Sequence, residues 1–225
     1  MASCPKTISV IIPALNEEAY LPALLGLLVK RAPHEIIVTD GGSTDATADI
    51  CREFGVTFLH GTAGRGLQMN RGAEISTGDI LFFVHADSIL PENWESEIRS
   101  LLHKPDVLAG SFCLEFDKNS FFLNFYARCS RRAHWLFTYG DQGLFLHREV
   151  FHQIGGFLQP RLMEDVDILR RLHRKGRVVK SALAITTSSR RYEQNGIILQ
   201  QARNTMLLMA YLAGISPELL ARYYH

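Results

Sequence analysis

Four short apolar runs mark the first half of the chain, and each is followed by a polar turn. They are TISVII, EIIVT, VTFLH and ILFFVH, which start at residues 7, 35, 56 and 80. Short runs bounded by turn residues predict strands, and leucines at helical spacing, as between Leu21 and Leu28, predict the helices that join them. The alternation therefore predicts βαβ units in a mainly parallel sheet through about residue 105.

Two of the predicted helices have recognisable starts. Asn16, followed by two glutamates, predicts an N-cap with an acidic first turn for the helix that contains Leu21 and Leu28. Ser43 or Thr44 would cap a second helix that ends near residue 55.

The pattern loosens after residue 105. Residues 107–116 and 143–148 predict strands, residues 155–157 a turn, residues 164–175 a helix, and the last thirty residues helices with a break at 214–217. No linker rich in Pro, Gly or Ser separates the halves, so we expect one domain over residues 1–225. Its parts would be residues 1–105, a second segment at 106–195 and C-terminal helices at 196–225.

Composition is that of an ordinary folded protein, with 47% hydrophobic and 21% charged residues, but the charge is unevenly spread. Residues 1–117 hold 8 Lys and Arg against 16 Asp and Glu, whereas residues 118–225 hold 16 against 7. The acidic half suits a metal ion and the basic half suits phosphate or an anionic surface, although a chance distribution of solvated charges explains the same numbers.

Neither long apolar run has the length of a membrane span or of a secretory signal. Ile8–Ile12 has five residues and Met206–Ile215 has ten, whereas a bilayer needs ~20. These lengths predict a cytoplasmic protein, in which the four cysteines, lacking a CxxC pair, would be free thiols.

Candidate chemistry lies at three βα junctions, PALNEE, TDGGSTDAT and HADS, because a parallel sheet brings its carboxyl ends together. In the second, Asp40 would accept hydrogen bonds from a ribose or a base, although the segment is also a plain loop before a helix. In the third, His85 and Asp87 are two residues apart and would face one cleft if the strand continued; a buried histidine beside a turn aspartate is the alternative. Neither GxGxxG nor GxxxxGK[ST] occurs.

Taken together, these segments resemble the family 2 glycosyltransferases. The resemblance runs in order through VIIPALNEEAYLPALL, IIVTDGGSTDAT, GRGLQMNRGAEISTGDILFFVHADS, YGDQGLFLHREVFHQIGGF and MEDVDILRRL, and covers residues 7 to about 175. It implies the α/β GT-A fold, a Rossmann-like, mainly parallel sheet flanked by helices that binds a nucleotide sugar. An acceptor-side extension and C-terminal helices would complete this fold.

The same resemblance implies roles for single residues. Pro13, Glu17 and Asp40 would contact the nucleotide, Asp87 would bind the metal ion, and Asp165 would be the catalytic base. The implied cofactor is Mn²⁺ or Mg²⁺, and Mg²⁺ takes one or two carboxylates together with substrate phosphates.

His85 departs from the family pattern, because it stands where the first carboxylate of the DxD motif is usual. It would contact the sugar or the diphosphate, or favour Mn²⁺ as the metal. Glu164, next to the proposed base, is a further candidate substrate contact, although acids in the first turn of a helix also stabilise its dipole.

Five more residues are candidate substrate contacts by their position. Arg190 or Arg191 would close over the diphosphate, and Arg65 is a similar candidate, although solvated basic loops are the alternative. Asp141 and Gln142, in the sequence GDQG, would line the acceptor pocket.

The resemblance thus implies transfer of a sugar from a nucleoside-diphosphate sugar to an acceptor, with inversion, and we expect no nucleic acid as a partner. The eight aromatic residues within 116–139 would cover a lipid-linked acceptor or stack on a small-molecule sugar, or they are simply core. The C-terminal helices would contact the inner face of a membrane or a second copy of the chain, unless they pack on the body. A sugar nucleotidyltransferase and a catalytically silent nucleotide-binding protein are the alternatives.

Overall fold

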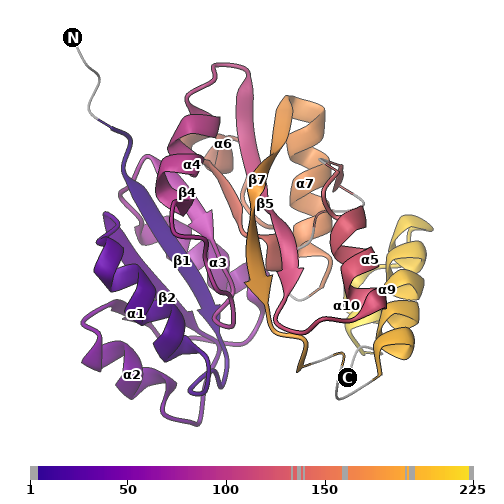
Figure 1. The fold of residues 1–225 in the computed structure, drawn as a ribbon, viewed down its shortest axis with the longest axis horizontal. Coiled ribbons are helices and arrows are strands. Elements are labelled where there is room, and N and C mark those ends of the chain that lie inside the picture. Colours follow the sequence, from indigo (N-terminus) through magenta and orange to yellow (C-terminus); the bar gives the residue numbers. More distant parts are fainter. Residues whose placement is uncertain are drawn as a thin grey trace.

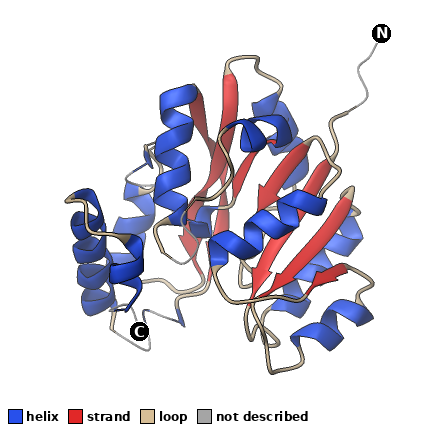
Figure 2. Cartoon of the chain, turned by 180° about the vertical axis from the view of Figure 1, so that it is seen from behind, coloured by secondary structure: helices blue, strands red, loops and turns tan. Residues whose placement is uncertain are grey.

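A computed structural model of the chain describes residues 5–132, 134–135, 138, 140–158, 162–190, 192 and 196–222. Within these residues the centre of the fold is a seven-stranded sheet in the order β3-β2-β1-β4-β6-β5-β7 (Figures 1 and 2). Its strands are β1 (Ile8–Ala14), β2 (Glu35–Asp40), β3 (Thr57–Leu59), β4 (Ile80–Phe83), β5 (Val107–Phe116), β6 (Leu144–His147) and β7 (Arg177–Thr187). Only β6 runs antiparallel to its neighbours in this sheet, so the predicted mainly parallel arrangement is confirmed.

Helices cover both faces of the sheet. On one face lie α1 (Leu21–Arg31), α2 (Thr47–Glu53) and α4 (Trp94–Leu102), and on the other α3 (Arg65–Ile75), α6 (Arg148–Gln153) and α7 (Glu164–Lys175). Beside the β5 and β7 side of the sheet are α5 (Phe121–Cys129), α9 (Ile197–Leu212) and α10 (Pro217–Arg222) (Figure 1). The result is three layers, with a further group of helices at one side.

The core follows from the alternation of side chains along the strands. Phe82 points to one face and stacks on Trp94 of α4, with ring centroids 5.2 Å apart. Phe83 points to the other face and meets Phe157 edge-on at 5.1 Å. Because both faces are covered, these central strands are apolar at every position, which is the pattern that the sequence shows.

Two predicted helix caps are wrong, because the helices begin later and the side chains of Asn16 and Ser43 form other hydrogen bonds. Helix α1 begins at Leu21 with Tyr20 at the cap, and α2 begins at Thr47, whose cap position holds Ala46. Asn16 instead accepts a hydrogen bond at 2.9 Å from the backbone N–H of Thr44. It thereby links the loops that follow β1 and β2.

The remaining predicted elements are confirmed within the described residues. Strand β5 spans the predicted 107–116, α7 spans the predicted 164–175, and α9 and α10 are separated at the predicted break. Gly155 and Gly156 form the predicted turn with positive φ angles of 76° and 64°. No helix in the described part of the chain is both long enough and apolar enough to cross a membrane.

Candidate active site

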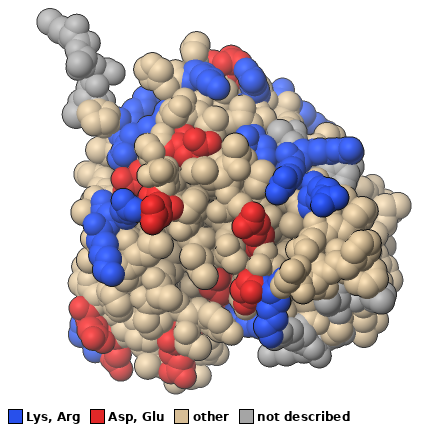
Figure 3. Space-filling model, in the orientation of Figure 1, with Lys and Arg blue, Asp and Glu red and all other residues tan. Residues whose placement is uncertain are grey.

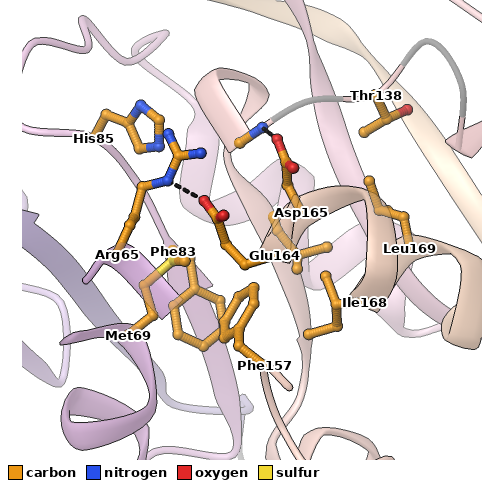
Figure 4. Close-up of a pocket in the computed structure, with 12 residues that line it drawn as sticks. Arg65, Met69, Phe83, His85, Thr138, Phe157, Glu164, Asp165, Ile168 and Leu169 are labelled. Carbon is orange, nitrogen blue, oxygen red and sulfur yellow. Dashed lines mark hydrogen bonds and ion pairs between the residues drawn. The ribbon is translucent and has the colours of Figure 1, made fainter. Parts of the chain in front are cut away.

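A cleft of about 1150 Å³ opens at the carboxyl ends of β1 and β4, where open α/β sheets bind ligands. Its walls come from the loops after these strands, the starts of α3 and α7, the turn at 140–142, the loop after β7 and helix α9. Eight residues singled out from the sequence line it together: Pro13, Glu17, Arg65, His85, Asp87, Asp141, Asp165 and Arg190. Glu164 lines a smaller hollow that shares Arg65, His85 and Asp165 with the cleft (Figure 4).

Arg65 and Glu164 form a partly buried ion pair that joins the start of α3 to the start of α7 (Figure 4). The Arg65 Nε donates to Oε1 of Glu164, whose side chain is fully buried, whereas that of Arg65 is 33% exposed. Burial raises the pKa of Glu164, while the charge of Arg65 opposes this rise. The pair fixes where α7 begins, and with it the position of the next residue, Asp165.

Asp165 is held by two backbone N–H groups. The N–H of Gly140 donates to its Oδ2 and the N–H of Val166 to its Oδ1, both at 2.8 Å. Each carboxylate oxygen has a further lone pair, so Asp165 can still accept a proton from a ligand in the cleft. A carboxylate fixed in this way at the wall of a cleft is a candidate general base.

The turn at 140–142, which supplies one of these N–H groups, is tethered from behind by Lys180 of β7. The Lys180 ammonium donates to Gln142, to Ser111 Oγ at 2.7 Å and to Thr138 Oγ1 at 3.2 Å. Burial lowers the pKa of Lys180 to about 8, although Cys113 and Asp141 act in the opposite direction. Sequence patterns did not point to this lysine, because each of the three groups that it contacts is at least 38 positions away from it in the chain.

Replacement of Lys180 by Met is expected to destabilise the fold by about 1–3 kcal/mol, because it removes the hydrogen bonds from the ammonium to the buried Gln142, to Ser111 and to Thr138. Urea unfolding at neutral pH measures this change. The matched control is Lys175→Met at the exposed end of α7, which should change stability by at most about 0.5 kcal/mol. If the two substitutions changed the free energy of unfolding equally, the hydrogen bonds of Lys180 would contribute nothing to stability.

In the part of the chain that the structure describes, three aspartates line the cleft, and its two arginines are each paired with a glutamate. Burial raises the pKa of Asp141 to about 7, and the nearby Asp165 and Asp87 add to the rise, whereas Arg65 and Lys180 oppose it. The Oδ1 atom of Asp141 is buried and has no hydrogen-bond partner among the described residues.

Such a site fits a divalent cation, which would satisfy the bare oxygen and offset the charges. The described residues include no group of three or more His, Cys, Asp or Glu arranged to hold a metal ion. The protein therefore offers part of a coordination shell, and oxygens of a ligand would have to complete it.

His85 and Asp87 reach the cleft by a different route from the one predicted. Strand β4 ends at Phe83, and the two residues lie in a turn closed by a hydrogen bond of 3.2 Å from the Ser88 N–H to the His85 carbonyl. The argument from strand alternation is therefore wrong, although both side chains line the cleft. A Cβ atom on Gly140 would lie 3.1 Å from His85 Nε2, so the glycine lets the 140–142 turn approach this histidine.

Arg190 lies three residues after the end of β7 and also lines the cleft. Its Nη2 donates to Glu17 Oε1 at 2.7 Å, and its guanidinium lies 4.7 Å from the ring centroid of Tyr20. These contacts hold the Arg190 guanidinium at the cleft wall, next to the loop that follows β1. Arg191 lies outside the described residues.

Gln68 of α3 is a positioning residue that sequence reasoning missed. Its amide donates to the carbonyls of Ala14 at 2.8 Å and Thr39 at 2.7 Å, and its Oε1 accepts from the Gly64 N–H at 3.3 Å. One buried side chain thus joins the ends of β1 and β2 to the loop before α3. A glutamine inside a glycine-rich stretch gives no pattern that would reveal this role.

Two predicted contacts, Asp40 and Gln142, line neither the cleft nor the smaller hollow beside it. Asp40 is buried, and its carboxylate accepts hydrogen bonds from Gly42 N–H at 2.9 Å, from the N–H and hydroxyl of Ser43, and from His60 at 3.0 Å. Burial would raise the pKa of Asp40, but these hydrogen bonds hold it below its usual value. Gln142 is fully buried behind the turn. In this structure both hold loops in place, and their contacts with a substrate stay predictions.

The wall across from the sheet combines polar and apolar side chains. Helix α9 contributes Gln200, Gln201, Asn204, Thr205, Leu207 and Leu208, and Phe116 and Tyr126 extend this wall. Leu207 and Leu220 pack against Leu162, so part of the C-terminal apolar run serves as core.

Comparison with known proteins begins with the sequence profile of Glycosyl transferase family 2, which matches residues 9–159. A PGL/p-HBAD biosynthesis glycosyltransferase of Mycobacterium bovis is 39% identical over 93 residues, which are 37% of this chain and 36% of that protein. A 4,4'-diaponeurosporenoate glycosyltransferase of Staphylococcus haemolyticus is 41% identical over 91 residues, or 36% of this chain and 24% of that protein. The matched segment therefore spans about a third or less of the length of each of these two relatives.

Solved structures show the same fold. A mannosyltransferase of Pyrobaculum calidifontis, in complex with GDP-Man and Mn²⁺, superposes with a TM-score of 0.76 at 19% identity, over 98% of this chain and 68% of that one. The glucosyl-3-phosphoglycerate synthase of Mycobacterium tuberculosis, with Mn²⁺, UDP and phosphoglyceric acid, gives 0.68 at 19% identity, over 94% and 80%. These likenesses confirm the predicted GT-A fold. Since the family profile covers two thirds of its residues, the chain belongs to glycosyltransferase family 2.

Proposed function

We propose that the chain transfers a sugar from a nucleoside-diphosphate sugar to the hydroxyl group of an acceptor. The observation that carries this proposal is the convergence of Asp87, Asp141 and Asp165 on one cleft at the carboxyl edge of the sheet. Family membership and the donors named for the neighbours, GDP-Man and UDP-Glc, support it.

In the proposed reaction the acceptor oxygen attacks the anomeric carbon while the bond from that carbon to the diphosphate breaks. Asp165 removes the acceptor proton, and the nucleoside diphosphate leaves with the electron pair of the broken bond. Because Asp165 only takes a proton and forms no bond to the sugar, the displacement is single. The anomeric configuration is therefore inverted.

Asp87 and Asp141 would hold a Mn²⁺ or Mg²⁺ ion together with diphosphate oxygens of the donor. The unpartnered Oδ1 of Asp141 supports this assignment, as do the Mn²⁺ and Mg²⁺ complexes of structural neighbours. The chemistry supplied by such an ion is neutralisation of the charge on the departing diphosphate. Arg65 and Arg190, which line the same cleft, would add positive charge near the departing diphosphate. His85, which also lines the cleft, would contact the sugar or the diphosphate.

The nucleotide is proposed to lie along the β1 loop, against Pro13 and Glu17, with Arg190 above it. The acceptor would enter beside α9, where amide and hydroxyl groups can bind its polar part and Phe116, Tyr126 and Leu208 its apolar part. This mixed wall suits either a small molecule or a lipid-linked acceptor. Binding of the C-terminal helices to a membrane or to a second copy stays a prediction.

Replacement of Asp87 by Asn is expected to weaken Mn²⁺-dependent nucleotide binding by at least about 10–100-fold, the loss seen when partners of metal ligands are removed. The fold should survive, because the Asp87 side chain lies at the cleft wall and not in the core. The measurement is the shift in melting temperature with UDP or GDP, each with and without Mn²⁺.

The control for this test is Asp49→Asn, which removes an exposed carboxylate from α2 outside the cleft. It should respond to nucleotide and Mn²⁺ as the native chain does. If the Asp87 variant also keeps the full Mn²⁺-dependent shift, Asp87 does not bind the metal ion.

A further inference from the structure

Helix α5 presents an apolar face to solvent. The side chains of Phe121, Phe122 and Phe125 are 80%, 53% and 63% exposed, whereas Leu123 and Ala127 on the other side of the helix are buried. A single exposed aromatic residue is common on a protein surface, but three on one face of a helix mark an interaction site. None of the three lines the cleft.

The surroundings of this face are basic. Arg128 lies three residues after Phe125, at the spacing that places both on the same side of the helix, and Lys118 lies three residues before Phe121, just ahead of the helix. Arg131 and Arg132 follow directly, and all four cations are exposed. The sequence from residue 118 to residue 140 contains no Asp or Glu. Figure 3 shows a surface without charged side chains on the side of α5, with Lys and Arg side chains gathered above it.

We propose that the α5 surface, defined by Phe121, Phe122 and Phe125 with the four cations around them, docks on a membrane that contains anionic lipids. The rings would enter the boundary between head groups and acyl chains, while the arginines pair with lipid phosphates. This proposal goes beyond sugar transfer and does not depend on it, because lipid binding is measured without turnover.

A second copy of the chain fits this surface less well. In a two-fold symmetric pair the same patch meets itself, so the cations around one set of phenylalanines would approach those around the other. Like charges brought together in this way oppose association. A lipid surface has the opposite charge and requires no such match.

The position of α5 links the proposed docking to the cleft. Tyr126 of this helix and Phe116 just before it both line the cleft. With α5 on the membrane, the acceptor side of the cleft would therefore lie next to the lipid surface.

Flotation of the full chain with lipid vesicles tests the proposal. The chain should float with vesicles of phosphatidylcholine and phosphatidylglycerol, and much less with phosphatidylcholine alone. The double substitution Phe121→Ser and Phe125→Ser should lower the partition coefficient by about tenfold per ring. The triple substitution Arg128→Gln, Arg131→Gln and Arg132→Gln should lower it by about fivefold per arginine.

A matched control comes from α9, where Met206 and Met209 are 65% and 63% exposed. Changing both to Ser removes a similar apolar area elsewhere, and vesicle binding should persist. Native melting temperatures exclude misfolding as the cause of any loss.

Three results would overturn the proposal. The first is that the native chain floats with neither kind of vesicle. The second is that the phenylalanine variant floats as well as the native chain. The third is that the α9 variant loses flotation while the phenylalanine variant keeps it. Sedimentation of the native chain as a dimer that the phenylalanine variant abolishes would assign the surface to a second copy.

Discussion

Replacement of Asp165 by Asn is expected to lower sugar transfer by roughly 10²–10⁴-fold, the usual contribution of a general base, while donor affinity stays nearly unchanged. An amide has the same shape as the carboxylate and its oxygen can still accept the hydrogen bond from the Gly140 N–H, but it cannot take a proton. The measurement is the release of nucleoside diphosphate from the donor, with the acceptor or water as the attacking group, alongside donor binding.

Asp167 provides the control, because it lies on the same helix but pairs with Arg171 at 2.7 Å and does not line the cleft. Asp167→Asn should leave the rate within a few-fold of the native value. Full activity of the Asp165 variant, or a larger loss in the Asp167 variant, would remove Asp165 from the base position.

Replacement of Arg65 by Met is expected to destabilise the fold by about 3–5 kcal/mol, because it leaves the carboxylate of Glu164 buried without its partner. Burial already raises the pKa of Glu164, and losing Arg65 removes the charge that opposes this rise. The folded variant therefore binds a proton more readily than the unfolded chain does. The loss of unfolding free energy in this variant, relative to the native chain, should therefore shrink as the pH falls from neutral toward 4.5, the ordinary pKa of glutamate.

Two comparisons isolate this effect in urea unfolding at neutral pH. Arg52→Met, which breaks the exposed pair with Asp49, should cost at most about 1 kcal/mol. Adding Glu164→Met to the Arg65 variant should recover most of the loss, because two apolar groups replace the buried pair. A deficit in the Arg65 variant as small as that of the Arg52 variant would show that Glu164 is solvated or neutral in the native fold.

The strands and the outline of the site were predictable, because they depend on local patterns. Apolar runs and polar turns located β1, β2 and β4, and the rule that parallel strands end at one edge placed Glu17, Asp87 and their neighbours at one cleft. These inferences need no knowledge of which side chains touch.

Helix α3 was not predicted, since its sequence RGLQMNRGAEI contains two glycines and has no clear apolar stripe. The packing explains the glycines. A Cβ atom on Gly72 would lie 2.5 Å from Ile11 Cγ2, so only glycine lets α3 approach the sheet this closely. Tertiary packing here outweighs the local cost of glycine in a helix.

The roles of polar residues were hardest to predict, because a side chain can bind either a ligand or the protein itself. Asp40 looked like a ribose contact, yet it accepts hydrogen bonds from its own loop and His60. Gln142 looked like a pocket residue, yet it accepts from Lys180, 38 positions away in the sequence. The contacts of Asp40 with His60 and of Gln142 with Lys180 join positions far apart in the sequence, which spacing does not encode, whereas the bonds of Asp40 within its own loop are local.

The most direct test of the account is a crystal structure of the chain grown with Mn²⁺ and UDP or GDP, with the metal located by anomalous scattering. The account predicts one Mn²⁺ bound to diphosphate oxygens and to Asp87 and Asp141, with the nucleotide along the β1 loop and Asp165 facing the site of the sugar. Metal and nucleotide bound elsewhere, with these three carboxylates untouched, would contradict it.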